Sequence, residues 1–377
     1  MMKQKKVILS AGGTGGHLFP AQVIGDQLGY HCDLLFVGAK LAQNRFFDSQ
    51  RFPFKEIPAS PFSVKKILTI LQGVAISRKI IKEFQPDLVI GFGSYFTFPL
   101  LLSALLMGVP IMLHEQNALP GRVNRLFSPF AKTTAVSFPK TVDLLRGENI
   151  VEVTFPLRQT RILDKVSSEI GQIFDGSSPC ARLREKRIDS WEYFGLEKGK
   201  TTILVFGGSQ GAKALNHLFM EIVPALTLDT QILHFTGDRE SAHLASSLYK
   251  RLGYRYSVKD FEERMECAFE VADCALTRAG AATIAELVEW EKPALLIPFP
   301  FAKDDHQVVN GQHFVEDVKG GALLLQKRAT PLLLKTTLFQ LMEEREEKKK
   351  NIQKYKESKK LKEFPDLIIE FLEHYEK

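Results

Sequence analysis

Two glycine-rich stretches decide the fold of this chain: Ser10-Ala11-Gly12-Gly13-Thr14-Gly15-Gly16-His17 and Phe206-Gly207-Gly208-Ser209-Gln210-Gly211-Ala212. Each follows a short apolar run typical of a buried strand, at 7–9 and 203–205, and each opens a helical pattern. In a strand–turn–helix unit, backbone N–H groups at the start of the helix can face a phosphate. Because the stretches lie half a chain apart, we predict two similar α/β domains whose phosphate-facing turns meet across one cleft.

The bulk composition agrees with a two-domain globular protein. At 377 residues the chain exceeds the size at which a single core keeps growing, and 45% of its residues are hydrophobic and 25% charged. A net charge of +6 favours anionic ligands or an anionic membrane face, and no nucleic acid partner is expected. The cysteines lack metal or redox spacing, which predicts reduced thiols in the cytosol. They are Cys32, Cys180, Cys267 and Cys274.

Strand-like runs alternate with helical stretches in both halves, which predicts two doubly wound parallel sheets. The runs lie at 7–9, 34–37, 88–90, 111–113 and 134–136, then at 203–206, 231–236, 255–258, 274–277 and 294–297. We expect an N-terminal domain over 1–158, a linker with an insertion over 159–200, a C-terminal domain over 201–362, and a final helix over 363–377 that packs back on the first domain. The charged stretch 343–362 is expected to be a solvated helix.

Two apolar segments could be taken for a membrane span and a secretory signal, but their sequences favour neither. The uncharged stretch 95–113 is as long as a membrane span. However, Pro99 fits the first turn of a helix, Gly108 its end, and Pro110 precedes a short strand, so we expect a buried helix and strand instead. The run behind the basic start of the chain stops at Gly12, which is too short for a secretory signal.

Polar clusters follow several of the predicted strands. The first turn lacks the dinucleotide spacing, because Leu18 stands where the third glycine would be, and a tight turn alone does not explain His17. The stretch 114–125 (His-Glu-Gln-Asn, then Pro-Gly-Arg-Val-Asn-Arg) suits sugar hydroxyls, with a purely structural loop as the alternative. In 277–287, Glu286 could hold a ribose, or it could be an ordinary surface carboxylate. The stretch 298–310 contains Asp-Asp-His without a second cluster of ligands, so no metal is expected.

A helix predicted over 65–82 carries apolar and basic side chains. It could pack on its own sheet, or it could rest on an anionic membrane surface.

Taken in order, these motifs resemble the MurG family of bacterial peptidoglycan synthesis, the UDP-N-acetylglucosamine–N-acetylmuramyl-(pentapeptide) pyrophosphoryl-undecaprenol N-acetylglucosamine transferases. The resemblance rests on Gly-Gly-Thr-Gly-Gly-His at 12–17, His-Glu-Gln-Asn with Pro-Gly and Asn-Arg at 114–125, Gly-Gly-Ser-Gln-Gly-Ala at 207–212, Arg-Ala-Gly-Ala at 278–281 and Asp-Asp-His-Gln at 304–307. It implies the GT-B fold of two Rossmann-like domains, with the nucleotide sugar held mainly by the second. It also implies UDP-GlcNAc and undecaprenyl-linked lipid I as substrates and a peripheral position on the cytoplasmic face of the inner membrane. No cofactor is implied, and other cell-wall synthesis proteins are further candidate partners.

The resemblance also implies the site residues. Glu286 would bind the ribose hydroxyls, Ser209 the phosphates, and Gln307 and Asn117 the N-acetylglucosamine. The turn Thr14, Gly15 and Gly16 would face the donor sugar and the pyrophosphate of the acceptor. Further candidate substrate-binding residues are Asn124, Arg158, Gln210, Glu262, Arg278, Gly280, Ala281, Ala282, Thr283, Ile284, Ala285 and His306.

Two motifs and one further residue depart from the family pattern. The family's Gly-Asn-Pro-Val-Arg is Thr-Phe-Pro-Leu-Arg at 154–158, and its Gly-Gly-Tyr is Gly-Ser-Tyr at 93–95. Glu262 stands where the family has a hydrophobic residue against the uracil.

The mechanism we expect is direct, inverting displacement at the anomeric carbon by the 4-hydroxyl of the muramyl sugar. The helix start at 281–283 and Arg158 would stabilise the departing UDP without a metal. His17 is the first candidate for the general base, because its unperturbed pKa is near 6.5, and Glu115 is the second. Two other functions remain open: a related enzyme with a different lipid acceptor, and a UDP-sugar-binding protein without catalysis.

Overall fold

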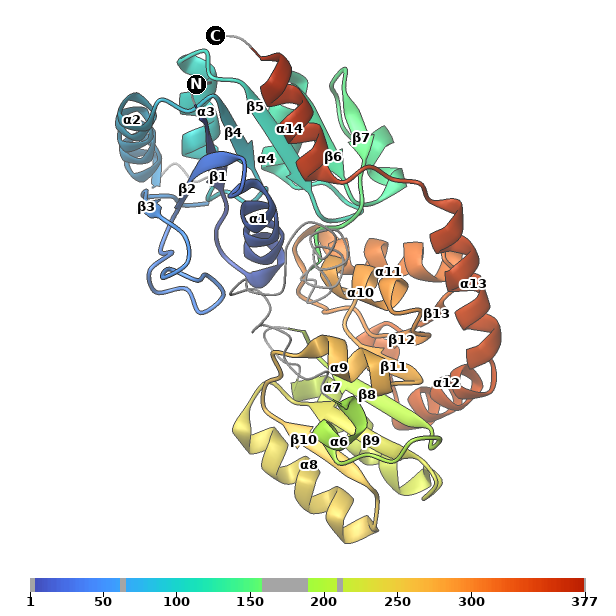
Figure 1. Ribbon diagram of the computed structural model, residues 1–377. Helices are drawn as coiled ribbons and strands as arrows, with labels where there is room; N and C mark the ends of the chain where they lie inside the picture. Colours follow the sequence, from blue (N-terminus) through green and yellow to red (C-terminus); the bar gives the residue numbers. More distant parts are fainter. Residues whose placement is uncertain (1–3, 62–65, 158–188, 209–212, 376–377) are drawn as a thin grey trace, which may run out of the picture. The chain divides into compact units, whose positions relative to one another are not determined.

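The computed structural model describes residues 4–61, 66–157, 189–208 and 213–375 (Figure 1). The chain forms two compact units, Met1–Arg158 with Lys360–Lys377, and Gln159–Lys359. The predicted insertion at 159–200 lies mostly outside the described residues.

The first unit is built on a seven-stranded sheet in the order β3-β2-β1-β4-β5-β6-β7, with every pair parallel. The strand order reverses between β1 and β4, so ligands are expected outside the carboxyl ends of these two strands. The strands are β1 (Lys5–Ser10), β2 (Cys32–Gly38), β3 (Phe54–Glu56), β4 (Leu88–Gly91), β5 (Ile111–Glu115), β6 (Thr133–Val136) and β7 (Ile150–Glu152).

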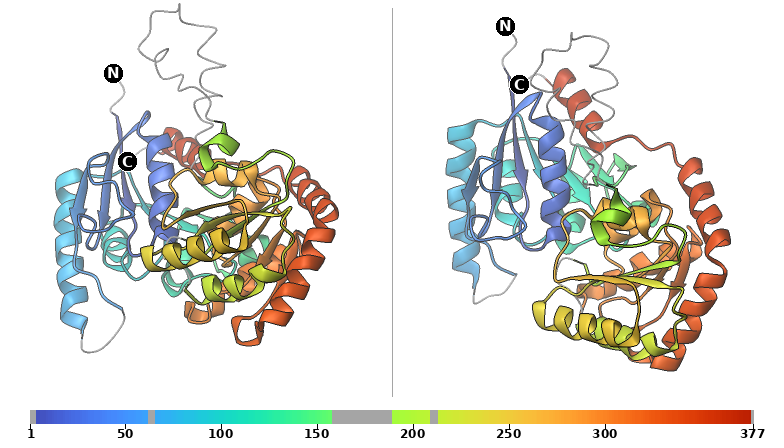
Figure 2. Two further views of the ribbon diagram at one scale, coloured as in Figure 1. Left: turned by 90° about the horizontal axis from the view of Figure 1, so that it is seen from below. Right: turned by 60° about the horizontal axis from the view of Figure 1, so that its bottom comes forward.

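Helices cover both faces of this sheet (Figure 2). Alternate residues of a strand point to opposite faces, so Val7 and Leu9 share one core cluster while Ile8 belongs to another. The first cluster holds α1 (Gly15–Leu28) and the C-terminal helix α14 (Phe364–His374); the second holds α2 (Ile67–Phe84), α3 (Phe98–Leu106) and α4 (Arg122–Phe127). Both faces are therefore buried, which explains why the strands read as continuous apolar runs.

The uncharged stretch 95–113 forms a buried helix and a strand. Pro99 lies in the first turn of α3, Gly108 adopts a left-handed φ of 70° after the helix, and β5 begins at Ile111. No helix of the described residues has the length and apolar character needed to cross a membrane.

The second unit repeats the plan with six parallel strands in the order β10-β9-β8-β11-β12-β13. The strands are β8 (Thr202–Phe206), β9 (Gln231–Phe235), β10 (Tyr256–Lys259), β11 (Cys274–Thr277), β12 (Ala294–Leu296) and β13 (Gly321–Leu323). The helices are α6 (Ser190–Phe194), α7 (Lys213–Ile222), α8 (Arg239–Leu252), α9 (Met265–Val271), α10 (Ala281–Glu289), α11 (His306–Glu316), α12 (Pro331–Glu343) and α13 (Arg345–Ser358).

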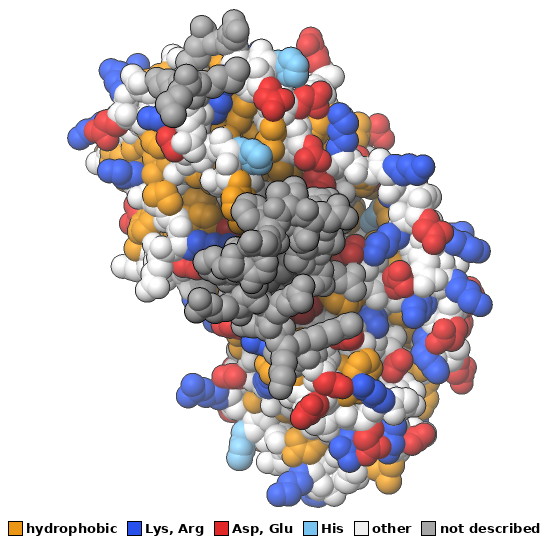
Figure 3. Space-filling view, viewed as in Figure 1, with side chains coloured by type: hydrophobic (Ala, Val, Ile, Leu, Met, Phe, Trp, Pro, Cys, Tyr) orange, Lys and Arg blue, Asp and Glu red, His pale blue; other side chains and the backbone are white. Residues whose placement is uncertain are grey.

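The charged stretch near the end of the chain is helical. In α13, Ile352 is the buried residue, and the other side chains are exposed or half-buried. Figure 3 shows Lys, Arg, Asp and Glu side chains interspersed on the surface along this part of the chain. The expected solvated helix is thus confirmed over α13, whereas Glu343 ends α12 and residues 359–362 lie beyond the helix.

Candidate active site

The glycine turn after β1 needs its glycines for two physical reasons. Gly13 has a left-handed φ of 89°, which side chains rarely adopt. The ring of Phe96 lies so close that a Cβ on Gly12 or Gly13 would come within 2.9 Å of it. The Asn44 side-chain amide donates to the Gly13 carbonyl at 2.7 Å and fixes the turn from the other side. Thr14 caps α1 with its backbone and is exposed, as is Gly16.

His17 is the third residue of α1 and is half-buried. Its Nδ1 lies 2.8 Å from the carbonyl oxygen of Phe92, the residue that follows β4, and 3.3 Å from Oε1 of Gln116, which follows β5. A carbonyl can only accept, so Nδ1–H donates and the ring lone pair is on Nε2. Three strand ends thus meet at one imidazole. The sequence indicated the histidine, but it gave no sign of the backbone carbonyl that orients it.

Glu115 organises the loop that follows β5. It is 2% exposed, and its Oε1 accepts from the Asn117 N–H at 3.0 Å while Oε2 accepts from the Gly121 N–H at 2.9 Å and the Asn124 amide at 2.8 Å. These bonds occupy both carboxylate oxygens, which is what a buried carboxylate requires.

Asn124 belongs to the same internal network, and its contact with substrate stays a prediction. Its side chain is fully buried and donates to the His114 carbonyl as well as to Glu115. Asn117 is half-buried beside this network, so it stays a candidate for contact with a ligand.

In the second unit, the carboxyl ends of β8 and β11 lie side by side, where the strand order reverses. Gly207 and Gly208 follow β8, and Gly208 has a left-handed φ of 78°. Ser209 and Gln210, together with Arg158 from the first half, lie outside the described residues.

Arg278, the first residue after β11, is a buried cation. It is 6% exposed, and its Nη1 donates to the carbonyls of Ile297 and Pro298 at 3.0 and 3.3 Å. Its Nε lacks a hydrogen-bond partner, and no carboxylate of the described part of the chain pairs with it. Burial lowers the pKa of Arg278 to about 10, so the guanidinium is still charged at neutral pH. An unpaired buried charge of this kind suits an anionic ligand.

Helix α10 begins three residues after Arg278. The positive end of its dipole therefore adds to the positive potential of the guanidinium. Its cap is Gly280, and its first turn contains no acidic residue that would offset the helix dipole. The side chains of Ala281 and Thr283 are buried, and the N–H groups of 281–283 precede the first bond within the helix, from the Ile284 N–H to the Gly280 carbonyl, so these three groups can face a ligand. Glu286 is half-buried one turn into the helix.

The loop after β12 carries local backbone strain. Asp304 and Asp305 adopt left-handed φ values of 54° and 52° directly before α11 begins at His306. Gln307 Oε1 accepts from the Phe299 N–H at 2.9 Å, and His306 Nδ1–H donates to the Lys303 carbonyl at 2.7 Å.

Among the described residues, no group of three or more His, Cys, Asp or Glu side chains could hold a metal ion.

Glu262 follows β10 and turns its side chain into the second unit. The carboxylate accepts from Lys259 Nζ at 2.6 Å, from the Arg264 N–H at 2.8 Å and from the Tyr193 hydroxyl of α6 at 3.2 Å. Burial acts to raise the pKa of Glu262, but these hydrogen bonds outweigh it and hold the pKa below its usual value. The side chain that departs from the family pattern is therefore committed to internal contacts.

Two doubly wound parallel sheets, each with its polar residues gathered at the carboxyl ends of the strands, define the chain as a GT-B glycosyltransferase. Two domain models of one family match it: the glycosyltransferase family 28 N-terminal domain over residues 7–136 and the C-terminal domain over 202–369. The chain belongs to this family and, within it, to the MurG-type UDP-N-acetylglucosamine–N-acetylmuramyl-(pentapeptide) pyrophosphoryl-undecaprenol N-acetylglucosamine transferases.

Relatives bear this name in several bacteria. The transferase of Protochlamydia amoebophila is 40% identical over 338 residues, covering 87% of this chain and 85% of the relative. That of Chlamydia trachomatis serovar L2 is 33% identical over 343 residues, covering 88% of both. The crystal structure of Acinetobacter baumannii MurG has a TM-score of 0.75 and 26% identity, covering 98% of this chain and all of the neighbour. A UDP-glucosyltransferase from Polygonum tinctorium has a TM-score of 0.71 at 13% identity over 98% of both chains, a likeness of fold alone.

Proposed function

We propose that this chain transfers N-acetylglucosamine from UDP-N-acetylglucosamine to the 4-hydroxyl of the muramyl sugar of lipid I, inverting the anomeric carbon and giving lipid II. The observation that carries the proposal is the orientation of His17. Its Nδ1–H is held by the Phe92 carbonyl, so its basic Nε2 can take a proton from an attacking hydroxyl. The names of the relatives supply the donor and the acceptor.

His17 suits the general base better than Glu115. A base must present a lone pair to the substrate, and both oxygens of Glu115 already accept hydrogen bonds within the loop. Glu115 is also 2% exposed, whereas His17 is half-buried in the turn that opens α1. We assign Glu115 the task of shaping the loop that carries Asn117.

The second unit supplies positive potential for the departing diphosphate. As the glycosidic bond breaks, negative charge builds on the UDP oxygens. The Arg278 guanidinium and the N–H groups of residues 281–283 would stabilise this charge without a metal. Arg158 and Ser209 remain proposed phosphate contacts.

The remaining sugar and nucleotide contacts follow from the family motifs. Glu286 is proposed for the ribose hydroxyls and Gln307 with Asn117 for the N-acetylglucosamine, while 14–16 would face the sugar and the acceptor pyrophosphate. Because the Glu262 carboxylate is held by Lys259, we propose that the segment around it contacts uracil through main-chain groups. Further proposed contacts are Gln210, Gly280, Ala282, Ile284, Ala285 and His306.

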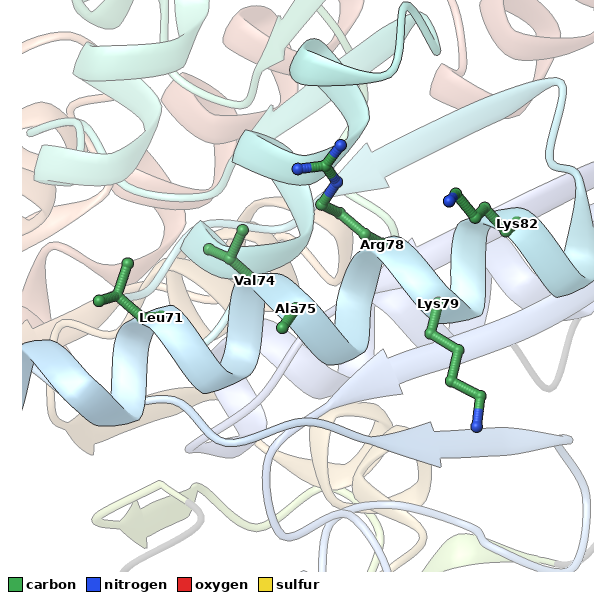
Figure 4. A pocket seen from close by; sticks show the side chains of 6 residues that line it. All are labelled: Leu71, Val74, Ala75, Arg78, Lys79 and Lys82. Atoms are coloured by element: carbon green, nitrogen blue, oxygen red, sulfur yellow. The ribbon is translucent and has the colours of Figure 1, made fainter.

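Helix α2 is proposed as the surface that rests on the cytoplasmic face of the inner membrane. Ile67, Leu68 and Leu71 are 55%, 71% and 57% exposed. A shallow hollow of about 470 Å³ is lined by Leu71 and the cations Arg78, Lys79 and Lys82. Arg78 and Lys82 project from the same side of the helix as Leu71 (Figure 4). Exposed apolar side chains next to cations suit a peripheral contact with anionic lipid.

The test is transfer of radiolabelled N-acetylglucosamine from its UDP donor to a lipid I analogue, with and without EDTA, by the unaltered protein and by H17Q. We expect lipid-linked product in both buffers, and a loss of about 10²–10⁴-fold in kcat for H17Q. A loss under about tenfold would remove His17 as the base.

The same assay separates the alternatives. Binding of UDP-N-acetylglucosamine without any product would favour a sugar-binding protein without catalysis. Product on another lipid acceptor, with none on lipid I, would change the acceptor and leave the donor site as proposed.

A further inference from the structure

The orientation of the Gln116 side chain can be read from its surroundings. Its Nε2 lies 3.1 Å from the Phe92 carbonyl and 3.3 Å from the His114 carbonyl. Both groups accept only, so the amide nitrogen must face them. The opposite orientation would turn Oε1 toward two carbonyl oxygens. The amide is therefore fixed, and Oε1 points to His17.

This fixed amide acts on the tautomer of His17. Nδ1 of His17 faces two oxygens, the Phe92 carbonyl at 2.8 Å and Gln116 Oε1 at 3.3 Å. Protonation of Nε2 instead of Nδ1 would leave the Nδ1 lone pair against both of them. The pair of acceptors thus favours the tautomer whose Nε2 can accept a proton.

The His114 ring contacts the Gln116 amide on the side away from His17. Its Nδ1 lies 3.1 Å from Gln116 Nε2 and must accept, which requires a neutral ring with its proton on Nε2, 3.4 Å from the Ser137 hydroxyl. His114 is fully buried, and Phe364 of α14 stacks on it with ring centroids 5.5 Å apart. Burial, with a smaller effect from His17, lowers the pKa of His114 to about 3, so it stays neutral at physiological pH.

We propose that Gln116 is a positioning residue that, together with His114 behind it, holds His17 as the Nδ1–H tautomer, in which Nε2 carries the lone pair. The role of His17 as base rests on the proposed function, whereas its tautomer is a property of the protein alone. In a catalytic triad, a carboxylate accepts from Nδ1–H and so holds the histidine in the tautomer that has a basic Nε2. Here two neutral oxygens, the Phe92 carbonyl and Gln116 Oε1, take this place.

Gln116→Met tests the proposal, because methionine keeps much of the volume and removes every polar contact of the amide. Gln22→Met is the matched control. Gln22 is a 6% exposed glutamine on α1 whose amide donates to the Leu18 and Phe46 carbonyls, and none of its described bonds involves His17. The full-length proteins would be labelled with 15N-histidine. Long-range 1H–15N correlation spectra then show which ring nitrogen is protonated, with H17Q assigning the signals among the nine histidines.

We expect His17 of the unaltered protein to be protonated at Nδ1 and bare at Nε2 at pH above its titration. In Q116M we expect a mixture of tautomers, a fall in kcat of about 10²-fold, and a KM for the donor within about twofold. Q22M should keep the spectrum and the kcat of the unaltered protein.

Either of two results would overturn the proposal: His17 of the unaltered protein protonated at Nε2, or a kcat of Q116M within about threefold of that of Q22M. The first needs no variant, so a poorly folding Q116M does not remove the test. A protein without transfer activity would overturn the proposed function, while the spectrum would still decide the tautomer.

Discussion

Arg278 is a residue that we expect to lower the stability of the fold while it contributes to the binding of an anionic ligand. Its charge is buried, two backbone carbonyls are its described hydrogen-bond partners, and its Nε has none. Because burial depresses its pKa to about 10, the cost of the buried charge is present at all pH values below that. Such a residue is expected to lower stability and to raise activity.

We therefore predict opposite effects of Arg278→Met on the two quantities. Steady-state kinetics should show kcat/KM for UDP-N-acetylglucosamine about 10²-fold lower, because one charged donor to the leaving group is lost. Thermal unfolding should show an unchanged or higher Tm, since the uncompensated charge is gone. The control is K292M, which removes a half-buried cation. Lys292 lies just before β12, and its Nζ donates to the Ala272 carbonyl. A normal kcat/KM for R278M would contradict the assignment.

Glu262 is the opposite case, a buried charge with several partners. Its pKa is depressed in the folded state, so it stabilises the fold above its usual pKa of 4.5, and this contribution is lost as the pH falls through the folded value. Glu262→Gln should lower the free energy of unfolding by about 1–3 kcal/mol at pH 7.

The difference between E262Q and the unaltered protein should shrink as the pH falls below 4.5. Urea unfolding at several pH values, followed by the fluorescence of the two tryptophans, Trp191 on α6 and Trp290, would measure it. The neighbouring, exposed Glu263 provides the control E263Q with the same change of charge. A difference that does not vary with pH would show that packing, and not charge, is what the substitution removes.

Among the elements, α2 has both a buried side and exposed apolar residues. Gly73, Ser77, Ile80 and Ile81 are buried, and Gly73 leaves no room for a Cβ because the Pro58 carbonyl would lie 2.2 Å from it. In the first turns, Ile67, Leu68 and Leu71 are exposed instead. Packing on the first unit therefore accounts for one side of α2 and leaves the other for an external surface.

We predict that the double variant L68Q/L71Q binds anionic phospholipid vesicles at least about tenfold more weakly in a sedimentation assay, since each buried leucine contributes about 1.5–3 kcal/mol. Its Tm should not change, because Leu68 and Leu71 are exposed in the folded protein. L228Q, at a 65% exposed leucine of the second unit, is the control. Equal binding by all three proteins would exclude α2 as the docking element.

On the scale of the whole molecule, the first unit is assembled from both ends of the chain. Phe364, Ile368 and Leu372 of α14 are buried in the same core cluster as Leu18 and Ile24 of α1. The backbone of Lys362 also pairs with Val153, just after β7. This unit therefore depends on residues more than 200 positions away in the sequence.

Phe364→Ala should destabilise the first unit by about 3–5 kcal/mol and leave the second unchanged. Both tryptophans, Trp191 and Trp290, lie in the second unit, so their fluorescence follows it selectively. Calorimetry should show one transition moved to lower temperature while the fluorescence midpoint stays in place. F314A, a buried phenylalanine of the second unit, should do the reverse. A joint shift of both signals would show that the units unfold together.

The sequence predicts the architecture better than the details of the site. All ten predicted strands are present. Nine of them read as apolar runs typical of buried parallel strands, whereas β10 is a half-buried edge strand. The edge strands β3, β7 and β13 escaped prediction: each has three residues, all exposed or half-buried, so no pattern marks them.

In the site, the motifs predicted His17, Glu115 and Arg278 as functional residues, and their roles stay predictions, but the motifs did not show how the fold holds these side chains. The acceptor for His17 is the main-chain carbonyl of Phe92, and carbonyl orientation depends on the tertiary fold. Ser94 illustrates the same limit. It adopts a left-handed φ of 68° where the family has glycine, a conformation the sequence gives no reason to expect.

The position of α14 has a consequence for synthesis on the ribosome. The second unit is fully encoded by residue 359, whereas the first lacks a core helix until residues 364–374 have been translated. Until then, the apolar side of α1 that α14 covers has no partner from the chain's own end. The later half of the polypeptide can thus reach its native state before the earlier half, which reverses the usual order of folding from the N-terminus. The nascent first unit therefore lacks this part of its core until the rest of the protein has been made.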